Sequence, residues 1–208
     1  MRRVVLGALL GALLGTGCAL TGKSAAIPVR YYTLEAPRAV DPDAAVATTA
    51  PRGKLRLGQI NAAAYIRDKI VVRRSAHELD FHDTWRWSED AEAYVHRALA
   101  RSLFQTHGLT QTLSGPGLTL EVDLDTFEER AGARRTARVE LTWRLRDARE
   151  VLVQRTVVVE RPIGHRKAIT GEDVASGLAQ VLAEALDHVV VDVLAETTAV
   201  ASTQPAAP

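Results

Sequence analysis

Residues 118–125 read LTLEVDLD, a strict alternation of apolar and polar side chains. This two-residue period is typical of a β-strand with one buried face and one face in water. Residues 138–145 (RVELTWRL) repeat the alternation, and residues 151–160 form a third such segment after a short turn at 147–150. We therefore expect these three strands to form an antiparallel meander.

Shorter segments before the meander also have strand character. Residues 30–34 (RYYTL) are rich in β-forming side chains, and segments 55–60, 70–74 and 77–81 are compatible with further strands. Residues 36–52 contain three prolines among small and polar residues, so we expect a long surface loop there.

Two segments have the three- and four-residue apolar spacing of amphipathic helices. The first begins with Ser88 as the expected N-cap and ends at Gly108. The second begins near Thr170, with Asp173 in a capping-box-like position, and ends near Glu196. The expected buried positions are Ala91, Tyr94, Val95, Ala98, Leu99, Ser102 and Leu103 in the first, and Val174, Leu178, Val181, Leu182, Ala185, Leu186, Val189 and Val193 in the second. The sequence thus predicts the α/β class: a single domain with a mixed β-sheet, an antiparallel meander and two main helices.

Length and composition fit one globular domain. The chain has 208 residues, of which 47% are apolar and 25% charged, with 26 Lys and Arg against 25 Asp and Glu. Removal of residues 1–17 takes away Arg2 and Arg3 and leaves 24 basic against 25 acidic side chains. Such a near-neutral chain is a poor candidate for nucleic-acid binding, which needs a strong excess of Lys and Arg.

The first 17 residues are predicted to be a signal peptide. Arg2 and Arg3 precede an apolar run of 11 residues, from Val4 to Leu14. The run is too short to cross a bilayer core, which needs about 20 residues. Small residues follow it and lead directly to Cys18, the one cysteine of the chain.

Cys18 is predicted to be the lipidated first residue of the mature protein. Small residues before a cysteine suit a lipoprotein signal peptidase, which cuts in front of a lipidated cysteine. Residues 18–29 then form a tether, 30–196 the folded domain and 197–208 a disordered tail. Ala19, in place of Asp, is expected to permit transfer to the outer membrane. The alternative is an ordinary signal peptide whose cleavage elsewhere discards Cys18.

The sequence contains little that indicates catalysis. Residues 77–83 (HELDFHD) form the densest polar group, but His77 and His82 point to opposite faces of a strand and do not converge on a metal. A phosphate-binding glycine loop, a nucleophile elbow and a His-Glu-x-x-His motif are all missing from the sequence. We therefore expect no catalytic residues, no metal site and no cofactor. The minor alternative is an exported hydrolase or metal-binding enzyme that uses His77, Glu78 and His82.

Arginines are concentrated at residues 130–149, where acidic residues lie among them. Our main interpretation is the solvated face of the meander, with arginines and acids paired across strands. The alternative is a patch that faces an acidic partner or anionic lipid headgroups.

Tyr65, Arg67, Trp85 and Trp87 are candidate partner contacts. Two tryptophans two residues apart point to the same side of an extended strand, and such a surface is costly to expose without a partner. The alternative is that the tryptophans cover the core beside the first helix.

Several of these segments together resemble the ABC-type transport auxiliary lipoprotein family, the PqiC/YmbA group. Their order and spacing carry the resemblance more than any one of them, and they span most of residues 18–107. They are, in order, Cys18, RYYTL at 30–34, YIRDKIVVR at 65–73, and RWSE at 86–89 leading into a helix that contains RAL at 97–99.

The resemblance implies a fold similar to the TolB N-terminal or anticodon-binding-like α/β domain. It also implies a non-catalytic accessory role beside a mammalian-cell-entry (MCE) domain protein, an ABC permease and an ATPase that move lipids between two membranes. Cys18 would anchor the chain in the periplasmic leaflet of the outer membrane, and association of copies into a ring fits the family. The alternative is a structural or assembly lipoprotein of the cell envelope, which would contact peptidoglycan or barrel proteins instead.

Overall fold

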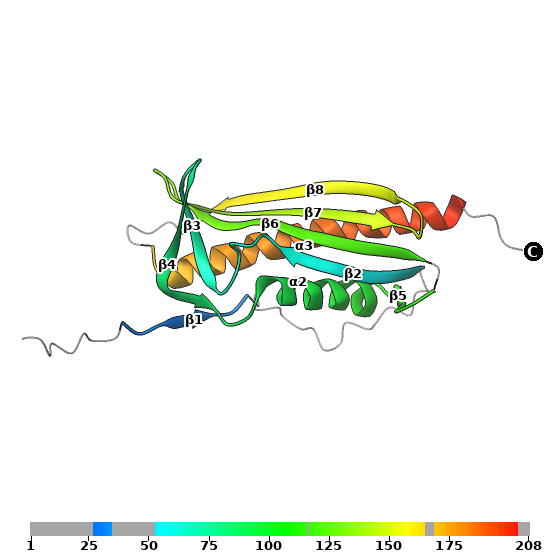
Figure 1. The fold of residues 1–208 in the computed structure, drawn as a ribbon, viewed down its shortest axis with the longest axis horizontal. Coiled ribbons are helices and arrows are strands. Elements are labelled where there is room, and N and C mark those ends of the chain that lie inside the picture. Colours follow the sequence, from blue (N-terminus) through cyan, green and yellow to red (C-terminus); the bar gives the residue numbers. More distant parts are fainter. Residues whose placement is uncertain (1–26, 35–52, 116, 165–168, 204–208) are drawn as a thin grey trace, which may run out of the picture.

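The computed structural model describes residues 27–34, 53–115, 117–164 and 169–203. Figure 1 shows two layers, a twisted β-sheet and two main helices that run along one of its faces. The predicted α/β class, with a mixed sheet in a single domain, is confirmed. The surface loop predicted at 36–52 lies outside the described residues. Within the described part of the chain, no helix is both long and apolar enough to cross a membrane.

The elements follow the predicted order of strands, helix, strands and helix. The strands are β1 (Arg30–Tyr32), β2 (Lys54–Ala62), β3 (Lys69–Ser75), β4 (Glu78–Trp87), β5 (Thr110–Gln111), β6 (Leu118–Arg130), β7 (Thr136–Arg146) and β8 (Val151–Pro162). The helices are α2 (Ala91–Ala100), the π-helical segment η1 (Arg101–Thr106) that continues it, and α3 (Gly171–Thr203).

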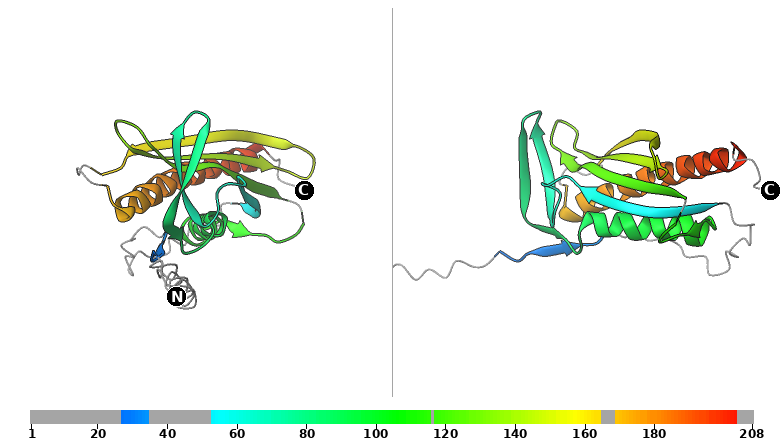
Figure 2. Two further views of the ribbon diagram at one scale, coloured as in Figure 1. Left: turned by 60° about the vertical axis from the view of Figure 1, so that its left-hand side comes forward. Right: turned by 45° about the vertical axis from the view of Figure 1, so that its right-hand side comes forward.

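The sheet is organised around β6. One edge of β6 pairs with β7 antiparallel, and β7 pairs with β8 in the same way, so the predicted meander is confirmed. The other edge of β6 pairs in parallel with β2 over residues 118–124 and with β3 at residues 129–130. β3 turns back into β4, which pairs in parallel with β1. Figure 2 shows the β3–β4 hairpin standing off the sheet at the end where β6 turns into β7.

The core lies between the sheet and the helices. All the positions predicted for the apolar face of α3, from Val174 to Val193, are buried. On the sheet side, β7 alternates between buried and partly exposed residues along its whole length. Its buried side chains are Ala137, Val139, Leu141, Trp143 and Leu145.

The predicted capping box of α3 is confirmed. The backbone N–H of Thr170 donates to Asp173 Oδ2 over 2.9 Å, and the backbone N–H of Asp173 donates to Thr170 Oγ1 over 3.2 Å. Each side chain thus satisfies a backbone donor that the helix leaves unpaired.

The start of α2 differs from the prediction. The helix begins at Ala91 with Asp90 as the N-cap residue. Ser88 is not the cap, because its N–H donates to the carbonyl of Tyr32 over 2.8 Å, which continues the ladder between β1 and β4. The predicted stop is confirmed at Gly108, whose φ of +70° is a conformation that favours glycine.

Two further boundaries differ from the prediction. β4 starts one residue later than the expected strand at 77–81 and continues to Trp87, because its second half pairs with β1. α3 extends to Thr203, so the tail predicted from residue 197 begins too early. The hydroxyls of Thr197 and Thr198 donate to the carbonyl of Leu194 over 3.0 and 2.8 Å, which accommodates these polar residues in the helix.

β1 docks against the start of α3 through two aromatic rings. Tyr32 and Trp85 meet edge to face, with ring centroids 6.3 Å apart, and both lie over Gly171. A Cβ atom at Gly171 would lie 2.7 Å from Trp85 Cε2 and would also collide with Tyr32 Oη. The absence of a side chain at Gly171 therefore allows the close packing of β1, β4 and α3.

Replacing Gly171 by Ala should destabilise the protein, because the new methyl group must displace Trp85 or the helix. We expect a loss of about 1–3 kcal/mol in the free energy of unfolding. Urea denaturation followed by circular dichroism measures this loss.

Gly132→Ala is the matched control, since its Cβ would meet only the carbonyl of Arg134 at 3.6 Å, an ordinary contact. This variant should change stability by less than about 0.5 kcal/mol. Equal stabilities of the Gly171→Ala variant and the original chain would contradict the close packing described above.

Candidate functional site

The open face of the sheet, defined as the face opposite α2 and α3, carries a ladder of ion pairs. Arginines of β7 pair with acids of β6 and β8, as the alternating pattern predicts. The pairs are Arg146–Glu121 at 3.5 Å, Arg144–Asp123 at 2.5 Å and Arg138–Glu160 at 3.2 Å. Each exposed pair contributes at most about 1 kcal/mol. The solvated-face interpretation is confirmed for Arg138, Arg144 and Arg146.

A β-bulge in β6 changes which residues face the helices. The register of β6 on β7 shifts between Leu124 and Thr126. The core positions are therefore even-numbered up to Leu124 and odd-numbered from Phe127 onward. Glu129 follows Phe127 onto the covered face, opposite Ala137, and its side chain is fully buried.

Glu129 is held by the side chains of His82 and Arg135, which come from neighbouring elements. Its carboxylate contacts His82 Nε2 of β4 at 2.9 Å and Arg135 Nε of the β6–β7 turn. Burial alone would raise the pKa of Glu129, but the hydrogen bonds to His82 and Arg135 outweigh burial and hold that pKa below its usual value. The ionised carboxylate thus ties β4 and the start of β7 to β6.

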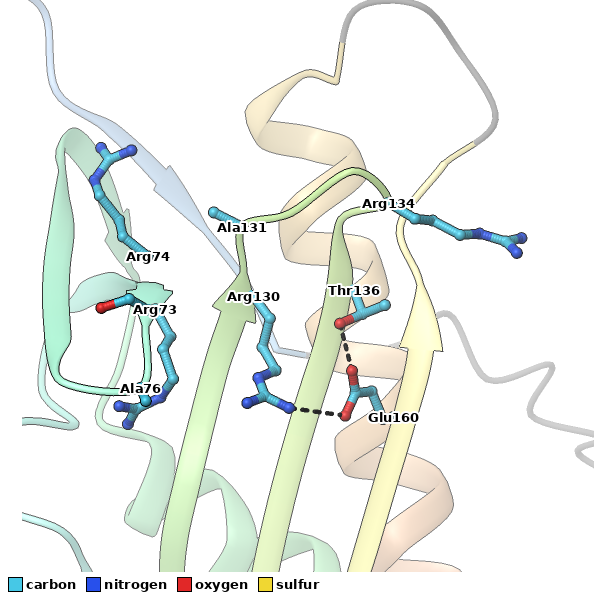
Figure 3. A pocket seen from close by; sticks show the side chains of 9 residues that line it. Arg73, Arg74, Ala76, Arg130, Ala131, Arg134, Thr136 and Glu160 are labelled. Carbon is cyan, nitrogen blue, oxygen red and sulfur yellow. Dashed lines mark hydrogen bonds and ion pairs between the residues drawn. The ribbon is translucent and has the colours of Figure 1, made fainter.

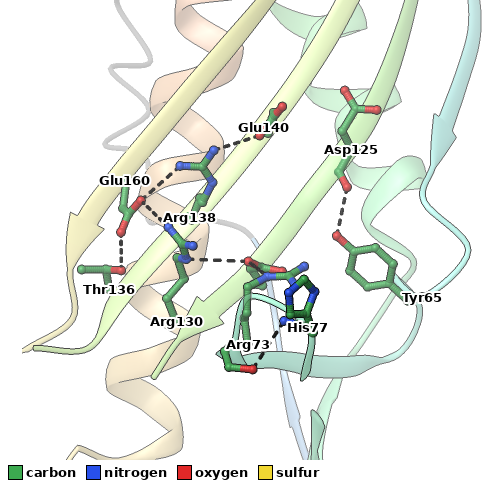
Figure 4. A network of polar contacts seen from close by, with 11 residues as sticks. Tyr65, Arg73, His77, Asp125, Arg130, Thr136, Arg138, Glu140 and Glu160 are labelled. Carbon is green, nitrogen blue, oxygen red and sulfur yellow. Dashed lines mark hydrogen bonds and ion pairs between the residues drawn. The ribbon is translucent and has the colours of Figure 1, made fainter. Parts of the chain in front are cut away.

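Glu128 is also buried, but it points to the open face, where its partners are Arg73 and Arg130. Figure 4 shows these two arginines together with Tyr65. Arg73 Nε of β3 contacts Glu128 Oε1 at 2.6 Å, and this hydrogen bond raises the pKa of Arg73. The second oxygen, Oε2, has no hydrogen-bond partner among the described residues. Tyr65 lies nearby and donates its hydroxyl to the carbonyl of Asp125 over 3.0 Å. Burial raises the pKa of Tyr65.

A hollow lies between the β3–β4 turn and the β6–β7 turn, and we call it the arginine hollow. Its volume is about 280 Å³. Figure 3 shows the side chains that line it, which come from both turns and from the end of β8. The charged ones are Arg73, Arg74, Arg130, Arg134 and Glu160.

Of the predicted partner contacts, Tyr65 and Arg67 lie in the loop between β2 and β3. Tyr65 is half-buried, whereas Arg67 is exposed, with its Nε donating to the carbonyl of Ala64 over 3.1 Å. The carbonyl of Asp68 accepts the N–H of Trp87 over 2.6 Å, so the loop follows the end of β4. Arg67 is therefore available to a partner.

The two predicted tryptophans have different environments. Trp87 is 3% exposed and stacks on Phe127, with ring centroids 5.4 Å apart. It belongs to the core, as the core-packing alternative states, and its side chain offers no surface to a partner. Trp85 is half-buried, stacks on His82 at 3.9 Å and leaves part of its ring accessible.

The remaining candidates from the sequence are Cys18 and the histidines His77 and His82. Cys18 and the predicted signal peptide, residues 1–17, lie outside the described residues. His77 lies in the β3–β4 turn, and His82 is bound to Glu129. In the ranges that the structure describes, no group of three or more His, Cys, Asp or Glu side chains is placed to hold a metal ion.

Sequence reasoning places Glu128, Glu129 and Arg135 among the paired charges of the solvated face, and the burial of the two acids corrects this prediction. A signal for them exists in the change of the apolar positions from even to odd numbers between Leu124 and Phe127. Such a change of phase within one strand marks a bulge and places one of two consecutive acids on the covered face.

Comparisons with known proteins agree with this architecture. The family model described as ABC-type transport auxiliary lipoprotein component matches residues 32–194. Among solved structures, a DUF330 protein from Xanthomonas campestris has a TM-score of 0.68 at 20% sequence identity, over 84% of this chain and all of the other. A second, described as an uncharacterized protein, has a TM-score of 0.62 at 16% identity, over 80% of this chain and 99% of the other. These two structures show a shared fold. A comparison with curated proteins gives no match.

Replacing Glu129 by Gln should weaken the folded state at pH 7 and change its response to acid. Loss of the charge weakens the hydrogen bonds from His82 and Arg135, at a cost of about 1.5–3 kcal/mol. Because folding lowers the pKa of Glu129, its contribution is present above the ordinary carboxyl pKa of 4.5 and is lost as the pH falls through the folded value. Urea denaturation between pH 7 and pH 3 should therefore show the two proteins converging in acid.

The exposed Glu150 in the β7–β8 turn provides the control variant, Glu150→Gln, which should follow the original chain throughout. A Glu129→Gln variant that is as stable as the original at pH 7 would show that the buried carboxylate contributes nothing. A constant difference down to pH 3 would equally contradict the assignment.

Proposed function

This chain belongs to the ABC-type transport auxiliary lipoprotein family, and from that premise we propose that it is a non-catalytic accessory component of an ABC/MCE-type system that moves lipids between membranes. The match over residues 32–194 carries the proposal, since it covers nearly all of the described domain. The permease, the ATPase and an MCE-domain protein are the proposed partners.

The chemistry of the described residues supports a non-catalytic role. The buried acid Glu129 is bound by His82 and Arg135, and Glu128 is held by Arg73. These contacts connect elements of the sheet, so the charged groups have a structural role. The arginine ladder on the open face is paired in the same way.

The anchor is part of the proposal. Cys18 carries the acyl chains, and residues 19–26 connect it to Ile27, where the described structure begins. A single acyl chain binds membranes only marginally, whereas several together anchor a protein firmly. Ala19 after the cysteine supports a final position on the periplasmic face of the outer membrane.

The anchor can be tested by mass spectrometry of the N-terminal peptide and by membrane fractionation. The mature chain should begin at Cys18 and carry acyl chains. An Ala19→Asp variant should move from the outer to the inner membrane fraction, while the control Ala25→Asp stays in the outer membrane fraction. A mature N-terminus beyond Cys18, without acyl chains, would overturn the anchor.

Contacts with the transporter are proposed at Arg67, with Tyr65 and the accessible part of Trp85 beside it. Arg67 is exposed on the loop between β2 and β3, and Trp85 lies near the end of β4 that this loop follows. Self-association is proposed through β8. Its outer edge is unpaired among the described strands, and Val151, Leu152 and Val158 are exposed along it.

Purification of the tagged, natively expressed chain in mild detergent should recover an MCE-domain protein with its permease and ATPase. An Arg67→Glu variant should reduce that recovery about tenfold or more, because it reverses the charge at the contact. The control Arg101→Glu changes an exposed arginine of η1 and should leave the recovery unchanged.

Recovery of barrel or cell-wall proteins alone would favour the alternative, a structural or assembly lipoprotein of the envelope. Equal recovery with the Arg67→Glu variant would exclude this loop as the contact. Mass spectrometry of the recovered proteins distinguishes these results.

A further inference from the structure

We propose that the arginine hollow is a binding site for a phosphate group, either free or in a lipid headgroup. The inference adds a ligand site to the proposed accessory function, but the binding can be measured on the isolated protein. Its outcome is therefore separate from the identity of the transport partners.

The hollow has an excess of positive charge. Four arginines line it, whereas the acids that line it or pair with these arginines are Glu160, Asp80 and Glu128. Arg138, the next arginine along the open face, pairs both with Glu140 at 2.9 Å and with Glu160 at 3.2 Å. The residues that line the hollow thus carry four positive charges against one negative charge.

Two of the arginines have hydrogen-bond donors to spare. Arg130 reaches Glu160 at 3.5 Å and Glu128 at 4.0 Å, which are long contacts for an ion pair. Arg134 is exposed in the β6–β7 turn and has no ion pair among the described residues. Arg73 and Arg74, in contrast, are held at 2.6 Å by Glu128 and Asp80. Arg130 is therefore the residue expected to contact the anion first. Arg134, whose side chain points away from Arg130 in Figure 3, is exposed in the turn and reaches the same anion after a change of rotamer.

The acid in the wall of the hollow is itself compensated. Glu160 Oε1 accepts the hydroxyl of Thr136 over 2.6 Å, and its Oε2 accepts a guanidinium N–H of Arg138 over 3.2 Å. Figure 3 shows Glu160 and Thr136 turned toward each other, with Arg130 of β6 reaching across β7 to Glu160 of β8. Arg130 can exchange its long contact to Glu160 for a shorter one to a ligand oxygen at little cost.

A phosphate group is the anion that suits this arrangement. Each guanidinium presents several N–H donors in a planar fork that matches phosphate oxygens. Several guanidiniums around one hollow can then bind different oxygens of the same tetrahedral group. The volume of 280 Å³ is close to the lower end of the range for ligand sites, about 300–1,000 Å³.

The position of the hollow favours the lipid source. Figures 1 and 2 place the β3–β4 hairpin and the β6–β7 turn at the end of the long axis where β1 enters the domain. From the proposed anchor at Cys18 to Ile27, nine residues span at most about 30 Å. The hollow therefore lies at the tethered end of the domain, with the length of β4 between it and β1.

The test uses the full mature chain, purified in mild detergent, with inorganic phosphate as the first probe. Calorimetric titration at constant ionic strength, with chloride as the reference anion, should show phosphate binding. The Arg130→Gln/Arg134→Gln variant should bind phosphate at least about tenfold more weakly, because each lost guanidinium removes charge-assisted hydrogen bonds. The control Arg101→Gln/Arg149→Gln removes the same charge from two exposed arginines elsewhere and should bind like the original chain.

Native mass spectrometry with added lipids identifies the source of the phosphate. Retention of phosphatidylglycerol, but not of diacylglycerol, together with its loss in the Arg130→Gln/Arg134→Gln variant, supports a lipid headgroup. Phosphate binding without phospholipid retention supports a free phosphate ligand. If neither probe binds, or if the variant binds as well as the original chain, the proposal is wrong. Should the double variant fail to fold, Arg134→Gln alone gives the same comparison, because this side chain lies exposed in a turn.

Discussion

The pairing of β6 with three other strands is the constraint on which the rest of the structure depends. One edge of β6 pairs with β7. The other edge pairs with β2 along the first half of β6 and with β3 at its end. Two separate strands cannot share one edge in a continuous register without a change of direction between them. The bulge after Leu124 provides that change, and it also rotates the following residues by half a strand period.

The rotation has a chemical consequence, because it places Glu129 on the covered face. A buried carboxylate needs hydrogen-bonding partners at fixed positions, since its desolvation costs several kcal/mol. His82 and Arg135 occupy those positions, and Arg73 holds the neighbouring Glu128. A pairing of this kind contributes less to net stability than to the choice of one arrangement. It fixes the β3–β4 hairpin, which otherwise has a short ladder with β6.

Local patterns predict the parts of this fold that depend on local physics. The alternation in the meander, the apolar face of α3 and the Thr170–Asp173 capping box are all read directly from spacing. The parts that fail depend on partners distant in sequence. Ser88 has the right side chain for a cap but is held by Tyr32, and the phase change after Leu124 becomes meaningful only once β2 and β3 are known to share an edge.

The candidate site also has some features that local patterns predict and others that depend on residues distant in sequence. The arginine ladder follows from alternation, because polar residues of adjacent strands must meet on the open face. Trp85 and Trp87 lie on the same strand with the same spacing, yet Phe127 covers one ring while the other borders Gly171 at the edge. Nothing in the local sequence distinguishes them, since burial is decided by what β6 and α3 bring to each ring.

The contacts at the tethered end give the domain a defined direction. Tyr32 and Trp85 fix β1 against Gly171, so the chain from the proposed anchor enters beside the first turn of α3. From there the 33 residues of α3 extend about 50 Å along the long axis of the molecule. A rigid helix that starts at the tether carries the opposite end, with the β7–β8 turn, away from the anchor. An accessory protein built in this way can hold one end at a membrane surface while the other end meets a partner farther away.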